Sequence, residues 1–167
     1  TSGGTASGNA SAAGGTASAS ASAANIAASL SLSLPVADFV IDDAQARSEE
    51  GPDFSEAVPQ DARSGTRHNM LSAALLDGDK FPTITLSSVA VTRTEGALGA
   101  TLVARIAGHE STLVVPFALE VSKDRVSAAG TVTLRQTALG LVPYSVMLGA
   151  LQVQDEFTVK FKLLAGT

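Results

Sequence analysis

From residue 83 onward, apolar and polar side chains alternate with a period of two, and no other feature constrains the fold of this chain as strongly. Successive side chains of a β-strand point to opposite faces, so the alternation predicts strands with one apolar and one polar face each. Tight turns such as Gly108-His109 separate neighbouring strands, which favours antiparallel pairing. The expected strands cover residues 83–91, 101–107, 111–120, 125–136 and 151–163.

A sheet with one apolar face has to hide that face, either by closing into a barrel or by packing on a second layer. One helical pattern of useful length is present, at about residues 66–76, where Thr66 can cap the N-terminus and Met70, Leu71 and Leu75 share a face. A single short helix cannot cover about seven or eight strands. The predicted fold is all-β, an antiparallel lipocalin-like β-barrel with a short helix (about 66–76) in one long connection.

The beginning of the chain is of low complexity. Residues 1–37 have no charged side chain, and the first part consists almost wholly of Ala, Ser, Gly and Thr. Such small side chains bury too little area to offset the ordering of the backbone, which costs roughly 1–2 kcal/mol per residue. We expect residues 1–15 to be a disordered start and residues 16–167 to form the barrel domain. Its first element is a hairpin turning near Asn25, with a weak first half at 16–22 and a strictly alternating second half at 29–34.

Composition excludes several classes of function. The net charge of −5 and the presence of only six Phe and one Tyr oppose a phosphate-neutralising surface or a base-stacking platform, so we expect no nucleic-acid partner. A chain without Cys has no disulfide, thiol nucleophile or Cys-based metal site. Residues 136–154 carry no charge, but Gly140, Pro143 and Gly149 interrupt them, so we expect no membrane span.

The sequence also lacks the patterns that mark known catalytic centres, including the nucleophile elbow, the zinc-protease helix, the phosphate-binding loop and the dinucleotide fingerprint. His68 and His109 are the only candidates for a neutral-pH general base. We interpret His109 as a solvated residue at a hairpin tip. His68, near the helix start, either caps the helix or hydrogen-bonds it to the barrel, which is the simpler interpretation, or makes a polar contact to a ligand head group. We therefore expect no enzymatic activity, no catalytic residue, no cofactor and no metal.

The inward face of the predicted barrel is mostly aliphatic. An eight-stranded barrel is about the size at which side chains fill the interior or one ligand occupies it. The small inward residues Ala104, Ala128 and Gly130 leave volume that costs stability unless it is occupied, and a slender apolar ligand would suit it. Small residues at a taper, or under the helix, are an equally good explanation. The predicted lumen residues are Ile84, Leu86, Leu102, Ala104, Ile106, Leu113, Val115, Phe117, Val132, Leu134, Phe157, Val159 and Phe161.

One polar residue interrupts the inward row of the last strand. Asp155 lies between Val153 and Phe157, at a position whose neighbours in the row are apolar. A buried carboxylate has to be paired or protonated. Asp155 therefore either points into the lumen toward an arginine such as Arg135, or is turned outward by a local bulge, and the second arrangement is the simpler one.

Three motifs occur within this pattern, and they are Gly65-Thr66-Arg67-His68-Asn69-Met70-Leu71, Lys80-Phe81-Pro82-Thr83-Ile84 and Gly140-Leu141-Val142-Pro143-Tyr144-Ser145. Over residues 28–165 their combination resembles the YceI-like family. The resemblance implies an extended antiparallel barrel that binds polyisoprenoid or related long-chain lipids, in a periplasmic or secreted bacterial protein. The chain itself contains no secretory signal, as expected of a trimmed or partial chain. Similar members begin with a strand containing Gly-His before the region of Ala17, and its replacement here by Ser/Gly/Ala sequence leaves open whether the first strands complete the barrel.

The leading hypothesis is a carrier that binds a long-chain apolar lipid in the lumen. The cluster of Arg67, His68 and Asn69 near the mouth would hold the head group of that lipid. The alternative is a structural or assembly module without a ligand, whose exposed N-terminal strand edges pair with another chain, for example in a homodimer.

Overall fold

The computed structural model describes residues 19–22, 25–94, 97–146 and 151–166. Its centre is a six-stranded antiparallel sheet in the order β10-β7-β6-β5-β4-β3. The predicted disordered start, residues 1–15, lies outside the described residues. The strands of the sheet are β3 (Ser31–Pro35), β4 (Thr83–Thr94), β5 (Ala97–Ile106), β6 (His109–Val121), β7 (Arg125–Arg135) and β10 (Glu156–Gly166).

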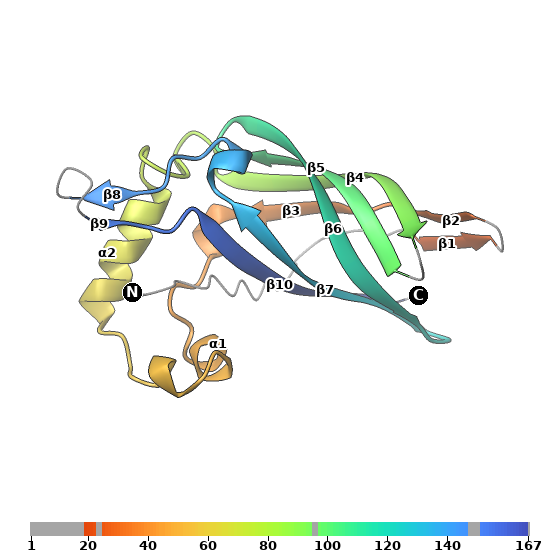
Figure 1. Cartoon of the computed structure of the whole chain (residues 1–167), viewed down its shortest axis with the longest axis horizontal. Coiled ribbons are helices and arrows are strands. Elements are labelled where there is room, and N and C mark those ends of the chain that lie inside the picture. Colours follow the sequence, from red (N-terminus) through yellow and green to blue (C-terminus); the bar gives the residue numbers. More distant parts are fainter. Residues whose placement is uncertain (1–18, 23–24, 95–96, 147–150, 167) are drawn as a thin grey trace.

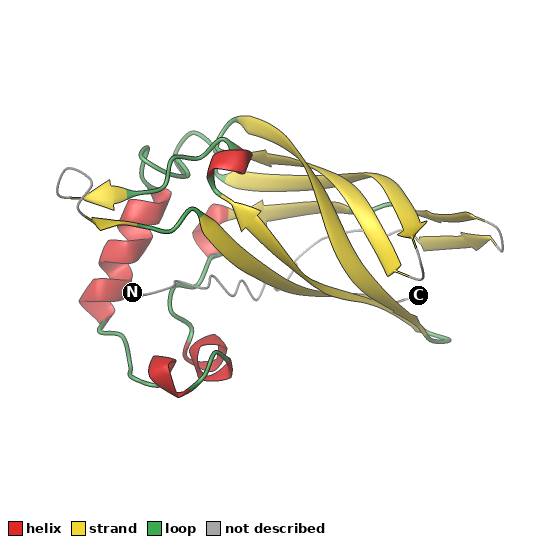
Figure 2. Cartoon of the chain, in the orientation of Figure 1, coloured by secondary structure: helices red, strands yellow, loops and turns green. Residues whose placement is uncertain are grey.

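Two small hairpins extend this sheet at opposite ends of the molecule (Figure 1). β1 (Ala19–Ser22) pairs with β2 (Asn25–Ala28), so a hairpin forms in the expected region, but the segment predicted as its second half, 29–34, becomes β3 and pairs with β4 instead. β8 (Ser145–Val146) pairs with β9 (Leu151–Gln152) close to the helical end. The helical elements gather at that same end of the sheet (Figure 2).

The strand pairing confirms the predicted alternation. Residues directly opposite each other in neighbouring strands share a face. Leu102 is opposite Leu113, and Val159 is opposite Val132, so the predicted inward residues of neighbouring strands meet on one face of the sheet. In β6, half-buried or buried residues alternate with exposed ones over Ser111–Leu119. We call the more buried face the inner face of the sheet.

The sheet curls because two of its strands bend. β6 pairs with β5 over residues 109–117 and with β7 only over 118–121. The change of partner follows Pro116, whose nitrogen has no hydrogen to donate to a neighbouring strand. A bulge between Ser88 and Ala90 of β4 adds curvature and leaves Val89 exposed.

The result is a curled half-barrel, which confirms the predicted all-β, lipocalin-like class (Figure 1). β3 and β10 are the two edges of the six-stranded sheet, and within the described residues they do not pair with each other. The inner face is therefore accessible along one side.

The predicted helix exists, but its position along the chain was wrong. α2 covers Gln60–Leu71, so Thr66 lies in its middle instead of capping it at the start. The helix begins after Pro59, whose carbonyl accepts the first helical hydrogen bond from Arg63, and it ends at Ser72. Leu75 and Leu76 belong to the turn that follows.

In the turn after α2, Asp77 has a positive φ of 46°. The other helical elements are α1 (Ala44–Glu49) and the 3₁₀ turns η1 (Val36–Asp38), η2 (Pro52–Phe54) and η3 (Thr137–Leu139). The elements η1, α1, η2 and α2 lie in the long connection between β3 and β4, and η3 lies between β7 and β8.

The last predicted strand, 151–163, is interrupted at Asp155, because this residue forms hydrogen bonds with the segment that follows β7. Its carboxylate accepts hydrogen bonds from the backbone N–H and the hydroxyl of Thr137, at 2.8 and 2.7 Å. Its carbonyl accepts another from the N–H of Gln136. These bonds break the strand into β9 and β10 and turn Asp155 out of the row. Val153, predicted to face inward, is 54% exposed.

The bonds to Asp155 predict a pH dependence of stability. The hydrogen bonds from the N–H and the hydroxyl of Thr137 lower the pKa of the Asp155 carboxyl, with Arg135 adding to the effect. The folded state therefore holds this proton less tightly than the unfolded state does. The resulting stabilisation is complete above the unfolded-state pKa, about 4, and is lost as the pH falls through the folded-state pKa.

We therefore expect Asp155→Asn to lower the melting temperature at pH 7, and the difference from the wild type to shrink as the pH is lowered below about 4. Thermal unfolding followed by circular dichroism between neutral pH and pH 2.5 measures both curves. A constant difference across that range would contradict the role assigned to the Asp155 carboxylate.

Gly130 in β7 is required by a close approach. A Cβ built there would lie 2.6 Å from Cζ of Phe161 and still closer to the carbonyl oxygen of Pro116. We expect Gly130→Ala to lower the free energy of unfolding by about 1–3 kcal/mol, because backbone and ring both have to shift. Gly99→Ala is the control, since its nearest contact would be 3.8 Å away. Urea denaturation of both variants measures the difference, and equal stabilities would contradict it.

Candidate functional site

The candidate site begins with the inner face of the sheet. It carries all the predicted lumen residues, and their strands are β4, β5, β6, β7 and β10. Leu102, Ala104 and Val115 are buried, whereas the others are only half-buried. Within the described residues, no large side chain is less than 2% exposed. The inner face is thus an apolar surface that the rest of the described chain covers only in part.

Two of the small inward residues do not leave the free volume that the sequence suggested. The ring of Phe161 packs against Gly130, so the space above this glycine is already filled. Ala104 is 1% exposed, so its neighbours cover it closely. The accessible part of the inner face lies instead over the larger side chains of the strands, such as Leu134 and Val159, which are half-buried.

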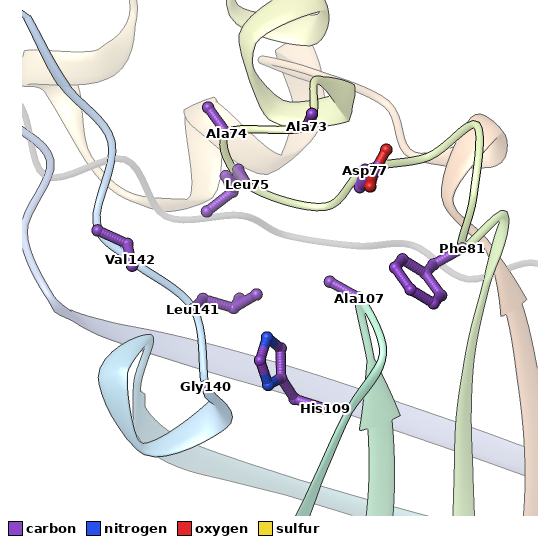
Figure 3. A pocket seen from close by; sticks show the side chains of 10 residues that line it. All are labelled: Ala73, Ala74, Leu75, Asp77, Phe81, Ala107, His109, Gly140, Leu141 and Val142. Atoms are coloured by element: carbon purple, nitrogen blue, oxygen red, sulfur yellow. The ribbon is translucent and has the colours of Figure 1, made fainter.

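At the helical end of the sheet, the inner face leads to a pocket of about 260 Å³, which we call the mouth pocket (Figure 3). Its walls come from the turn after α2, the β5–β6 hairpin and the segment after η3. The residues that line it are Ala73, Ala74, Leu75, Asp77, Phe81, Ala107, His109, Gly140, Leu141 and Val142.

The β5–β6 hairpin places His109 in this pocket. Ala107 and Gly108 both have positive φ, 48° and 79°, which is the geometry of a two-residue hairpin turn. The turn sets His109 opposite Ile106, and it therefore belongs to the inner-face row of β6. Figure 3 shows its imidazole between Gly140 and Leu141 on one side and Ala107 on the other.

Two glycines give the pocket its shape. A Cβ at Gly140 would lie 2.6 Å from Cγ of His109, so the imidazole packs directly on this backbone. A Cβ at Gly108 would lie 2.7 Å from Cζ of Phe81, whose ring forms another wall of the pocket. Both glycines have positive φ, so a side chain at either position would also strain the backbone.

The predicted head-group cluster lies on α2, outside the lining of the mouth pocket. The guanidinium of Arg67 donates to the carbonyls of Phe39, at 2.6 Å, and Ala37, and so joins α2 to the connection after β3. His68 is exposed, and Asn69 is half-buried with its carbonyl accepting from Ser72. The head-group role of these residues stays a prediction.

His109 was interpreted as a solvated residue at a hairpin tip, and it is indeed exposed at the β5–β6 turn, but its side chain also lines the mouth pocket. The sequence does contain a signal for this position. His109 is separated from Ser111 and Leu113 by an even number of positions along the strand, so it belongs to the same inner-face row of β6. Within the described ranges, no group of three or more acidic or histidine side chains is placed to share a metal ion. No helix of the described chain combines the length and the hydropathy needed to cross a membrane.

Comparison with solved structures identifies the same fold elsewhere. BcnA from Burkholderia cenocepacia superposes with a TM-score of 0.65 at 19% identity, over 91% of this chain and 84% of that one. A YCEI protein from Campylobacter jejuni gives a TM-score of 0.61 at 10% identity, over 93% of this chain and 82% of that one. A search of curated proteins finds no match. The profile of the YceI-like domain matches residues 2–165, nearly the whole chain, and the protein therefore belongs to the YceI-like family.

Proposed function

We propose that this protein is a binding or carrier protein for a long-chain, polyisoprenoid-like lipid that lies along the inner face of the half-barrel. The inner face itself carries this proposal, because it is a continuous apolar surface whose side chains are mostly half-buried. Family membership and the likeness to solved structures support a barrel-type binding protein. The length and width of the sheet favour an extended ligand over a compact one (Figure 1).

The energetics of burial favour a long chain. Each CH₂ group removed from water contributes about 0.8 kcal/mol, whereas association costs about 4–15 kcal/mol in lost translational and rotational freedom. About five CH₂ groups offset the lower cost and about nineteen offset the upper one, so a short chain gains too little to remain bound across this range and a long chain gains enough. The apolar rows of five strands supply a surface of matching extent.

The proposal contains no catalytic step. Within the described hydrogen bonds, neither His68 nor His109 is joined to a hydroxyl that it could activate as a nucleophile. We propose the bacterial periplasm as the cellular location of this carrier, as the family resemblance implies. A chain without cysteine is compatible with that location.

Recovery of a ligand is the direct test. We expect the protein purified from its natural host, extracted with organic solvent and analysed by mass spectrometry, to release a long-chain apolar lipid. Native mass spectrometry of the unextracted protein should show the matching mass difference. Bare protein in repeated preparations from that host would contradict the proposal and favour the alternative, a structural or assembly module without a ligand that pairs through exposed N-terminal strand edges.

The inner face can be tested by placing a carboxylate on it. Val159→Asp in β10 should abolish uptake of a long-chain lipid, because an unpaired charge would face the hydrocarbon. Lys162→Asp is the control, since Lys162 lies on the opposite face of the same strand and is exposed. Lys160 is less suitable because its ammonium binds Glu50.

The milder variant Val159→Thr keeps the shape of the side chain, so that a loss of uptake is not a loss of folding. We expect it to weaken uptake by a factor of about ten, as for a hydroxyl buried without a partner. Circular dichroism checks the fold of each variant, and equal loss at positions 159 and 162 would contradict the assignment of the inner face.

A further inference from the structure

We propose that the mouth pocket is a polar subsite, in which His109 hydrogen-bonds an uncharged end group of the bound chain, such as a hydroxyl, amide or ketone. This inference rests on the proposed function, because it specifies the end group of a chain that lies on the inner face. The argument uses the position and size of the pocket, the chemistry of His109 and the charge of Asp77.

The pocket lies at the end of the inner-face rows. His109, an exposed residue that lines the pocket, is the cross-strand partner of Ile106, the last inner-face residue of β5, so the pocket begins where these rows end. The volume of about 260 Å³ is below the range of about 300–1,000 Å³ that whole small-molecule ligands occupy. The pocket therefore takes the end of a ligand, while the rest of the chain extends over the half-barrel.

His109 suits an end group that both donates and accepts. A neutral imidazole has one N–H donor and one acceptor nitrogen, so it can bind a hydroxyl, an amide or a carbonyl. The walls beside it are the apolar side chains of Leu75, Phe81 and Leu141 (Figure 3). These walls would contact carbon atoms next to the end group, while His109 offers the end group a hydrogen-bond partner.

Asp77 disfavours an anionic end group. Its carboxylate lines the pocket, and its side chain is only 19% exposed. Lys80 contacts this carboxylate at 3.0 Å, with a side chain that is 72% exposed to solvent. Among the described residues that line the pocket, none is Arg or Lys. A phosphate or carboxylate would therefore meet the Asp77 carboxylate in the pocket, and the nearby ammonium of Lys80 is already paired with that carboxylate.

Three probes with the same chain length separate the contribution of the apolar chain to binding from the contribution of its end group. Hexadecane, 1-hexadecanol and hexadecyl phosphate are titrated below their aggregation concentrations, and the bound fraction is measured by native mass spectrometry. We expect the wild type to bind 1-hexadecanol about three- to ten-fold more tightly than hexadecane, as one net hydrogen bond predicts. Hexadecyl phosphate should bind more weakly than the alcohol.

Variants of His109 and Asp77 test whether the differences in affinity between the probes arise in the mouth pocket. His109→Leu should remove the preference for the alcohol and leave hexadecane unchanged, and His109→Gln should restore it because an amide also donates and accepts. Asp77→Asn should improve binding of the phosphate, and asparagine tolerates the positive φ of this position. Thr112→Leu, on the exposed face of β6, is the control that should change none of the three affinities.

The outcomes separate the two proposals. If hexadecane binds but the alcohol gains nothing, or if His109→Leu weakens all three probes equally, the polar subsite is wrong while the carrier function stands. If the phosphate binds as tightly as the alcohol, the selection by Asp77 is wrong. If the wild type binds none of the probes, the carrier function fails, and the subsite fails with it.

Discussion

The antiparallel register of the six-stranded sheet is the constraint on which the rest of this structure depends. Side chains alternate between the two faces, so a slip of one residue in any strand pair would move the apolar row of that strand into solvent. The turn at Ala107-Gly108 fixes the register of β5 and β6, because its two positive φ angles allow a loop of only two residues. The same turn sets where the inner face ends and the mouth pocket begins.

Local pattern was enough to predict the long strands and their faces. Apolar and polar residues alternate strictly in the strands of the second half of the chain, and burial acts on every second residue. The face of the sheet on which each side chain lies can therefore be predicted directly from the sequence. The helix was displaced because Leu75 and Leu76 continue an apolar pattern that the chain satisfies in a turn, where Leu76 is buried. The break at Asp155 depends on Thr137, eighteen positions earlier in the chain, and a short-range pattern contains no information about such a bond.

The candidate site was predictable in its apolar part and not in its polar part. The inner face follows from alternation, whereas the mouth pocket joins three segments that lie far apart in the sequence. The guanidinium of Arg67 binds backbone carbonyls about thirty residues away, a contact between segments that a local pattern cannot specify, and its predicted head-group role stays a prediction. Gly130 was expected to leave space, and its cross-strand neighbour Phe161 fills that space.

The contact between Gly140 and His109 links the two positions in evolution. Because the imidazole packs on a backbone that has no side chain, a relative with a larger residue at position 140 needs a smaller one at position 109, and the reverse. The two positions should therefore change together among related sequences. Relatives that keep the pair would share the polar end of the cavity, and those that have replaced both would accommodate a purely hydrocarbon terminus.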